Sequence, residues 1–143
     1  MKTILFADDQ KNIREFCRAT FAEQGYRVVL ACDGVEALKV FVAESPDVAI
    51  LDISMPRSSG LETLEQIKGL SPWTPVILFS AHRGDFIQDR RVLLATACVD
   101  KSHNLTELKQ IVAGALKTRP APESGGASVQ MGPPPLPAEI ESG

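Results

Sequence analysis

The sequence predicts an α/β fold in which a parallel five-stranded sheet is covered by helices on both faces. Short apolar runs alternate along residues 1–117 with longer segments whose apolar residues recur at helical spacing. Such alternation is typical of parallel sheets, whose right-handed crossovers leave few topologies. Residues 118–143 hold six of the ten prolines and four of the ten glycines. We therefore expect one domain, 1–117, followed by a disordered tail, 118–143.

The first half of the chain predicts three strands and two helices. Gly25 closes the first helix as a C-cap residue, Asp33-Gly34 forms the turn into the second helix, and Pro46 prevents that helix from continuing. The predicted elements are the strand 3–7, the helix 11–24, the strand 27–31, the helix after Gly34, and the buried strand 48–51, which leads into Asp52.

The second half predicts three more helices and two more strands. Ser58-Ser59-Gly60 offers a start for the third helix, and Asn104 is suited to cap the last one. The predicted elements are the helix 61–70, the strand 76–79 ending at Ser80, the helix 85–95, the strand 97–99 ending at Asp100-Lys101, and the helix 105–116. In the helix 85–95, the residues expected on the packed side are Phe86, Ile87, Val92 and Leu93.

Composition excludes several classes of function. The net charge of −3 and the pI near 5.4 give no basic surface for nucleic acid. Apolar runs are far shorter than the roughly 20 residues of a membrane span. Cys17, Cys32 and Cys98 are scattered without a CxxC motif, which indicates reduced, buried thiols and a cytoplasmic protein.

Acidic, hydroxyl and amine side chains stand at the ends of four of the five predicted strands. Asp8-Asp9, Asp52, Ser80 and Lys101 would all lie at the carboxyl edge of a parallel sheet, where such folds bind ligands. Each residue alone is explained as a cap, a turn residue or a solvated charge. Together, three carboxylates call for a hard cation such as Mg²⁺, and the amine and hydroxyl suit an aspartyl-phosphate. The sequence therefore predicts a phosphorylation site here.

In these motifs the chain resembles the receiver domain of two-component response regulators across residues 2–117. The motifs are Phe-Ala-Asp-Asp ending at Asp9, Leu-Asp-Ile-Ser-Met-Pro around Asp52 with Gly60 beyond, Phe-Ser-Ala around Ser80, and Val-Asp-Lys ending at Lys101. The resemblance implies a flavodoxin-like fold with strand order 2-1-3-4-5. It also implies phosphotransfer to Asp52 from a histidine kinase or phosphotransfer protein.

The resemblance also implies a role for each matched position. Mg²⁺ would be bound directly by Asp9 and Asp52, through water by Asp8, and by the backbone carbonyl of Ser54. The phosphoryl oxygens would be contacted by Ser80, by Lys101 and by the backbone N–H of Ala81.

Two positions depart from the family pattern. Cys98 stands where the family usually has an aromatic ring that swings inward on phosphorylation, and a small thiol cannot make that movement. Ser102 replaces the proline that commonly follows the lysine, so a cis peptide is not expected there. His82, two positions beyond Ser80, is more simply explained as an exposed loop residue than as a group that tunes dephosphorylation, and His103 as a surface residue.

The leading hypothesis is a stand-alone, phosphorylation-dependent receiver that signals to an unknown downstream protein and is compatible with homodimer formation. One alternative is a phosphorylation-independent interaction module that uses the face near Phe86 and Cys98. Another is an N-terminal receiver cut from a longer regulator. An aspartyl phosphatase is disfavoured, because such enzymes use Asp-x-Asp and this chain has the adjacent Asp8 and Asp9.

Overall fold

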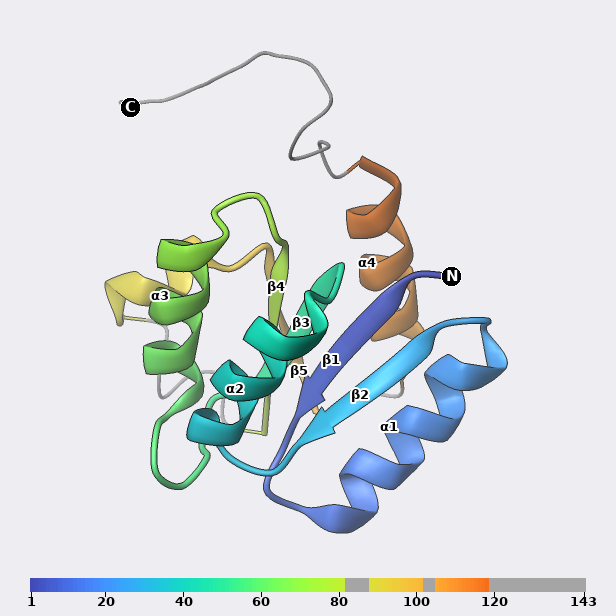
Figure 1. Ribbon diagram of the computed structural model, residues 1–143, viewed down its shortest axis with the longest axis horizontal. Helices are drawn as coiled ribbons and strands as arrows, with labels where there is room; N and C mark the ends of the chain where they lie inside the picture. The colour runs from blue at the N-terminus through green and yellow to red at the C-terminus, as the bar shows by residue number, and fades with distance from the viewer. Residues whose placement is uncertain (82–87, 102–104, 119–143) are drawn as a thin grey trace.

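The computed structural model describes residues 1–81, 88–101 and 105–118, and its centre is one parallel sheet (Figure 1). The strands lie in the order β2-β1-β3-β4-β5, which confirms the predicted topology. Their bounds are Thr3–Ala7 for β1, Arg27–Ala31 for β2, Val48–Asp52 for β3, Val76–Ser80 for β4 and Ala97–Asp100 for β5.

Helices cover both faces of the sheet, as predicted. Helices α1 and α4 lie on one face, and α2 and α3 lie on the other (Figure 1). Their bounds are Lys11–Glu23 for α1, Gly34–Glu44 for α2, Gly60–Leu70 for α3 and Leu105–Thr118 for α4, and a 3-10 helix, η2, spans Arg90–Leu94.

Alternate residues of the central strands enter two separate cores. Leu5 and Leu51 pack with the apolar faces of α2 and α3, whereas Ile4 and Ile50 pack with those of α1 and α4. Strands β1, β3 and β4 are buried along their whole length. Each fully buried aliphatic side chain contributes roughly 1.5–3 kcal/mol, so these continuous apolar strands supply much of the stability.

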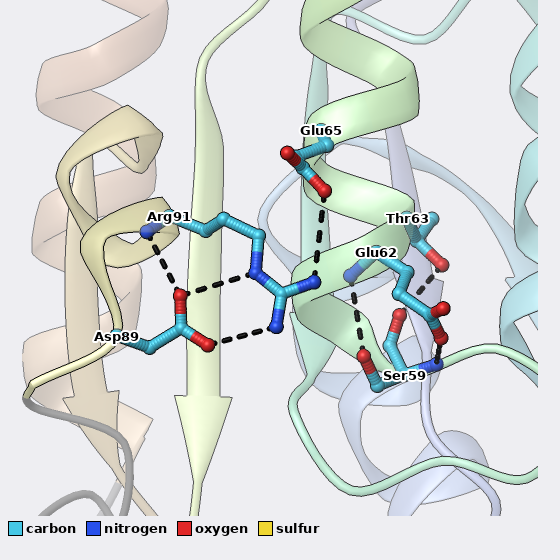
Figure 2. Close-up of polar contacts among 6 residues, drawn as sticks. All are labelled: Ser59, Glu62, Thr63, Glu65, Asp89 and Arg91. Carbon is cyan, nitrogen blue, oxygen red and sulfur yellow. Dashed lines mark hydrogen bonds and ion pairs between the residues drawn. The ribbon is translucent and has the colours of Figure 1, made fainter.

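The predicted helix ends are present where the structure describes them. Gly25 adopts the left-handed conformation, with φ of 91°, just after α1. The Asp33 side chain accepts a hydrogen bond of 2.8 Å from the backbone N–H of Glu36 and caps α2. Ser59 and Glu62 form a reciprocal capping box at the start of α3 (Figure 2). Asn104 lies outside the described residues.

The continuous helix predicted over 85–95 is wrong in its described part. Asp89 has an extended backbone, with φ of −77° and ψ of 122°, and its carboxylate caps the short helix η2. The same carboxylate holds the Arg91 guanidinium at 2.8 Å, and Arg91 reaches Glu65 of α3 at 3.6 Å (Figure 2). Local hydrogen bonding by Asp89 thus overrides the helical spacing. Val92 packs on the core, as predicted, but Leu93 is 81% exposed, so its predicted place on the packed side is wrong. Phe86 and Ile87 lie outside the described residues.

The three thiols lie in different environments. Cys17 is buried, as predicted, but Cys32 is exposed because it follows β2, an edge strand, and Cys98 is half-buried. No described helix is both long enough and apolar enough to cross a membrane. The predicted tail, apart from Thr118 at the end of α4, lies outside the described residues.

Candidate functional site

The carboxyl edge of the sheet gathers side chains from four strand ends. Asp8 directly follows β1 and is fully buried, and Asp9 beside it is exposed. Asp52 and Ser80 are the last residues of β3 and β4, with 6% and 2% of their surfaces exposed. Lys101 follows β5, and its N–H donates to the Ser80 carbonyl at 2.9 Å. The parallel register therefore places these residues at one edge.

The Lys101 side chain lies between two buried carboxylates. Its Nζ is 2.6 Å from Asp8 Oδ2 and donates a hydrogen bond of 3.0 Å to Asp52 Oδ2. Nζ is also 5.7 Å from the centre of the Phe79 ring, within the range of a cation–π contact. The Lys101 side chain is only 14% exposed, so the ammonium is held by these contacts rather than by bulk water.

Burial and charge shift the pKa values at this edge in directions that follow from the contacts. Burial raises the pKa of the Asp52 carboxyl, Lys101 opposes the shift, and Asp8 adds to it. For Lys101, burial works to lower the pKa, but the contacts with Asp8 and Asp52 prevail and raise it. Lys101 therefore stays charged, and a further cation would favour the ionised form of Asp52.

The three carboxylates fit a metal ion. One oxygen from each of Asp8, Asp9 and Asp52 lies within 4.8 Å of the others. Asp8 Oδ2 is buried and has the close ion pair with Lys101 but no partner in hydrogen-bonding geometry among the described residues. Oxygen donors with uncompensated negative charge are what Mg²⁺ requires. Asp8, Asp9 and Asp52 would hold such an ion.

The remaining predicted positions border the same edge. Ser54 is exposed, and its N–H donates to Asp52 Oδ1 at 3.2 Å, which orients the carboxylate. Ala81 directly follows Ser80 and is exposed. The structure thus brings Asp8, Asp52 and Lys101 into contact. The roles of Ser54, Ser80 and Ala81 stay predictions.

The departures from the family pattern are only partly covered by the described residues. Cys98 lies opposite Leu78 in the β4–β5 ladder and packs on the core beneath α2 and α3. His82, Ser102 and His103 lie outside the described residues. Cys17, on α1, is close enough to Asp8 and Lys101 to feel their charges, and burial above all raises the pKa of its thiol to about 12. At neutral pH that thiol is protonated and poorly nucleophilic.

Sequence reasoning missed two arginines that support this edge. Arg14 of α1 donates from its guanidinium to the Asp8 carbonyl at 2.8 Å. Arg57, in the loop after β3, lies 3.4 Å from Asp33 Oδ2. The Asp33–Arg57 contact joins residues 24 positions apart, and the Asp8–Arg14 contact joins a strand end to a helix. Neither contact could be predicted from the spacing of residues along one helix or strand.

Comparison with known proteins decides the family. Residues 4–113 match the family model for the response regulator receiver domain. The chain belongs to this receiver domain family. The match confirms the resemblance inferred from the motifs at the strand ends. Members of the family are signalling domains rather than classical enzymes.

Individual receivers and regulators are similar over most of this chain. The response regulator MprA of Mycobacterium tuberculosis is 35% identical over 130 residues, which is 90% of this chain and 56% of MprA. The chain thus spans little more than half the length of that curated relative. Response regulator TrrA of Thermotoga maritima, solved in complex with Mg²⁺ and BeF, is 39% identical with a TM-score of 0.76, and the match covers 80% of this chain and 99% of TrrA.

The Francisella response regulator 1452 receiver domain is a further solved structure of the same kind. It is 29% identical with a TM-score of 0.75, and the match covers 82% of this chain and 98% of that receiver. The flavodoxin-like receiver fold is therefore shared by proteins whose sequences differ widely from this one. The acidic cluster of this receiver is compatible with Mg²⁺.

Proposed function

We propose that this receiver accepts a phosphoryl group on Asp52 from a phosphohistidine of a histidine kinase or phosphotransfer protein, with Mg²⁺ as its cofactor. The observation that supports this most is the position of the Lys101 ammonium, 3.0 Å from Asp52 and 2.6 Å from Asp8. A cation between two buried acids at a ligand-binding sheet edge suits transfer of an anionic group.

The chemistry assigns one task to each side chain. A carboxylate oxygen of Asp52 attacks the phosphorus, a P–O bond forms, the P–N bond to the donor histidine breaks, and the imidazole leaves. Lys101 balances the negative charge of the transferred group. The Ser80 hydroxyl and the Ala81 N–H donate to phosphoryl oxygens. The receiver acts on itself in this step and in later loss of the phosphoryl group to water.

The metal would be held beside Asp52. Asp9 and Asp52 would bind it directly, Asp8 through water, and Ser54 through its backbone carbonyl. When bound, Mg²⁺ neutralises the acidic cluster and shares the charge of the phosphoryl group. Because burial raises the pKa of Asp52, a cation that favours the ionised carboxylate also favours the nucleophile.

A groove beside Lys101 supports a protein as the phosphoryl donor. The groove lies between α1 and α4 and encloses about 370 Å³; it is lined by Ile13, Phe16, Leu105 and Lys109 together with Lys101. Phe16 is 62% exposed and lies in this groove with Ile13 and Leu105 beside two lysines, and an apolar patch rimmed by charged groups is typical of a protein interaction site. We propose that the donor protein covers this groove while its histidine reaches Asp52.

Incubation with a small phosphodonor tests the proposal. Intact-mass spectrometry should show the gain of one phosphoryl group in the presence of Mg²⁺, and no gain with EDTA or in the Asp52→Asn variant. A wild-type protein that gains no mass, or a gain that survives Asp52→Asn, counts against the proposal.

A second candidate function is supported by Cys98. With a half-buried thiol where the family usually has a mobile ring, the receiver could bind its downstream partner without a phosphorylation switch. The Phe86 part of the surface suggested for this lies outside the described residues. Equal affinity for a purified partner with and without beryllofluoride favours this candidate, and a changed affinity favours the first.

The regulator context is also part of the proposal. Because MprA is longer than this chain, a receiver cut from a longer regulator remains the alternative to a stand-alone protein. In either case we propose a cytoplasmic location and a downstream protein partner.

A further inference from the structure

The loop that follows Asp52 contains a strained turn. The Ser58 N–H donates to the Pro56 carbonyl at 2.8 Å, two residues back, and Arg57 between them has a φ of 71°. This combination is a γ-turn of the positive-φ form, which is rare and strained. Glycine adopts such a φ without cost, but a side chain such as that of Arg57 does not. Other contacts must therefore hold the turn.

Those contacts come from the start of α2. A Cβ added at Gly34 would lie 1.9 Å from the Ser58 carbonyl oxygen, so the loop backbone packs directly against the glycine. The Arg57 guanidinium lies 3.4 Å from Asp33 Oδ2. The Asp33 side chain is 8% exposed and is already fixed by its hydrogen bond from Glu36. The ion pair thus ties the strained residue to a rigid, buried anchor.

The loop from Ile53 to Gly60 is closed by a hydrogen bond between its two ends. The Gly60 N–H donates to the Ile53 carbonyl at 2.9 Å, and Met55 is buried. The capping box of Ser59 and Glu62 fixes the entry into α3 (Figure 2). Because the two ends are joined, a change in the γ-turn at Arg57 changes the path of the whole loop backbone, which includes Ser54.

We propose that Arg57 is a positioning residue for the phosphorylation site, because its ion pair with Asp33 holds the γ-turn and thereby the Ser54 backbone at the Mg²⁺ position. This inference rests on the proposed Mg²⁺-dependent function. Arg57 does not touch the metal or the phosphoryl group itself. Its effect passes through the loop that connects it to Ser54 and Asp52.

If Arg57 positions the site, its removal should weaken Mg²⁺ binding, which is the opposite of what the loss of a positive charge would do. Because Arg57 is a cation, its removal would strengthen Mg²⁺ binding if charge alone mattered. As a positioning residue, its removal weakens Mg²⁺ binding unless the turn survives. Arg57→Ala and Arg57→Gly both delete the guanidinium, but only the glycine adopts the turn without strain.

The test is a Mg²⁺ titration of the whole chain that is monitored by two-dimensional NMR. Urea unfolding of each variant is measured in parallel. We expect Arg57→Ala and Asp33→Asn to weaken Mg²⁺ binding about three- to fivefold, because the lost ion pair includes a 59% exposed arginine and is partly screened by solvent. Arg57→Gly should stay within about twofold of wild type, and Arg57→Lys should recover most of the affinity by restoring the ion pair.

Two results overturn the inference in distinguishable ways. If wild type binds Mg²⁺ but the alanine and glycine variants bind equally well, or both more tightly than wild type, Arg57 does not position the site. If wild type itself binds no Mg²⁺ and takes up no phosphoryl group, the proposed function fails and this inference fails with it.

Discussion

Replacing Lys101 with methionine removes the ammonium that lies between Asp8 and Asp52. Methionine keeps a similar apolar length, so the variant loses the charge while retaining much of the packing. The Lys101 side chain is 14% exposed, and those of Asp8 and Asp52 are 0% and 8% exposed. Removing one partner of such a buried pair leaves uncompensated charge and costs about 3–5 kcal/mol. We expect the free energy of unfolding in EDTA to fall by that amount.

Magnesium should reverse much of this loss. The Lys101 charge competes with Mg²⁺ for the same carboxylates, so the methionine variant should bind Mg²⁺ more tightly than wild type. An ion that binds the folded state at 100 times its dissociation constant adds about 2.7 kcal/mol of stability. The gap between variant and wild type should therefore be smaller in saturating Mg²⁺ than in EDTA.

Urea unfolding followed by far-UV circular dichroism, with and without Mg²⁺, measures both effects. Lys39→Met is the matched control, because Lys39 is exposed on α2 and its loss should change stability by less than about 0.5 kcal/mol. A loss below about 1 kcal/mol for Lys101→Met in EDTA would refute the reasoning. So would a gap that stays the same or widens when Mg²⁺ is added.

Three further predictions follow from the same contacts. In EDTA at neutral pH, Asp52→Asn should stabilise the fold by roughly 1 kcal/mol and raise the melting temperature by a few degrees, because burial raises the folded-state pKa of Asp52 and its ionisation opposes folding. The gain should vanish below the ordinary carboxyl pKa of 3.8, and a lower melting temperature of the variant would contradict this prediction. Gly60→Ala should lower the free energy of unfolding by about 3 kcal/mol and slow phosphorylation, because the added Cβ would lie 2.3 Å from the Asp52 carbonyl oxygen. Gly69→Ala, on the same helix, adds its Cβ in open space and should be neutral or stabilising, so equal effects of the two variants on unfolding would contradict the close packing at Gly60. Phe16→Asp should slow phosphotransfer from a kinase about tenfold without changing phosphorylation by a small donor. Val42→Asp, at an equally exposed position on the other face, should change neither rate. A kinase rate that Phe16→Asp leaves unchanged argues against the groove as the docking site.

The parallel sheet and the gathering of acids at one edge could be predicted because they depend on patterns that sequence carries directly, whereas the strand order was implied by the resemblance to receiver domains. Buried parallel strands are continuous apolar runs, and parallel strands end at the same side. Once Asp8, Asp52 and Lys101 were placed at strand ends, their convergence followed. The contact distances of 2.6 Å and 3.0 Å agree with that placement.

Other features depend on contacts that periodicity does not show. The helix expected over 85–95 has good apolar spacing, but the Asp89 carboxylate binds Arg91 and starts a short 3-10 helix instead. The pairing of Arg57 with Asp33 depends on how a loop folds over the start of α2. The exposure of Cys32, just after the edge strand β2, was not predicted, because apolar neighbours in sequence do not show whether another element covers a side chain.

A crystal structure of the chain with Mg²⁺ and beryllofluoride would show whether Asp52 is the phosphoryl acceptor. We expect the beryllium on a carboxylate oxygen of Asp52, Mg²⁺ bound by Asp9, Asp52 and the Ser54 carbonyl, and the Lys101 ammonium on a fluoride. Beryllofluoride bound elsewhere, or a Lys101 side chain turned away from Asp52, would contradict this expectation.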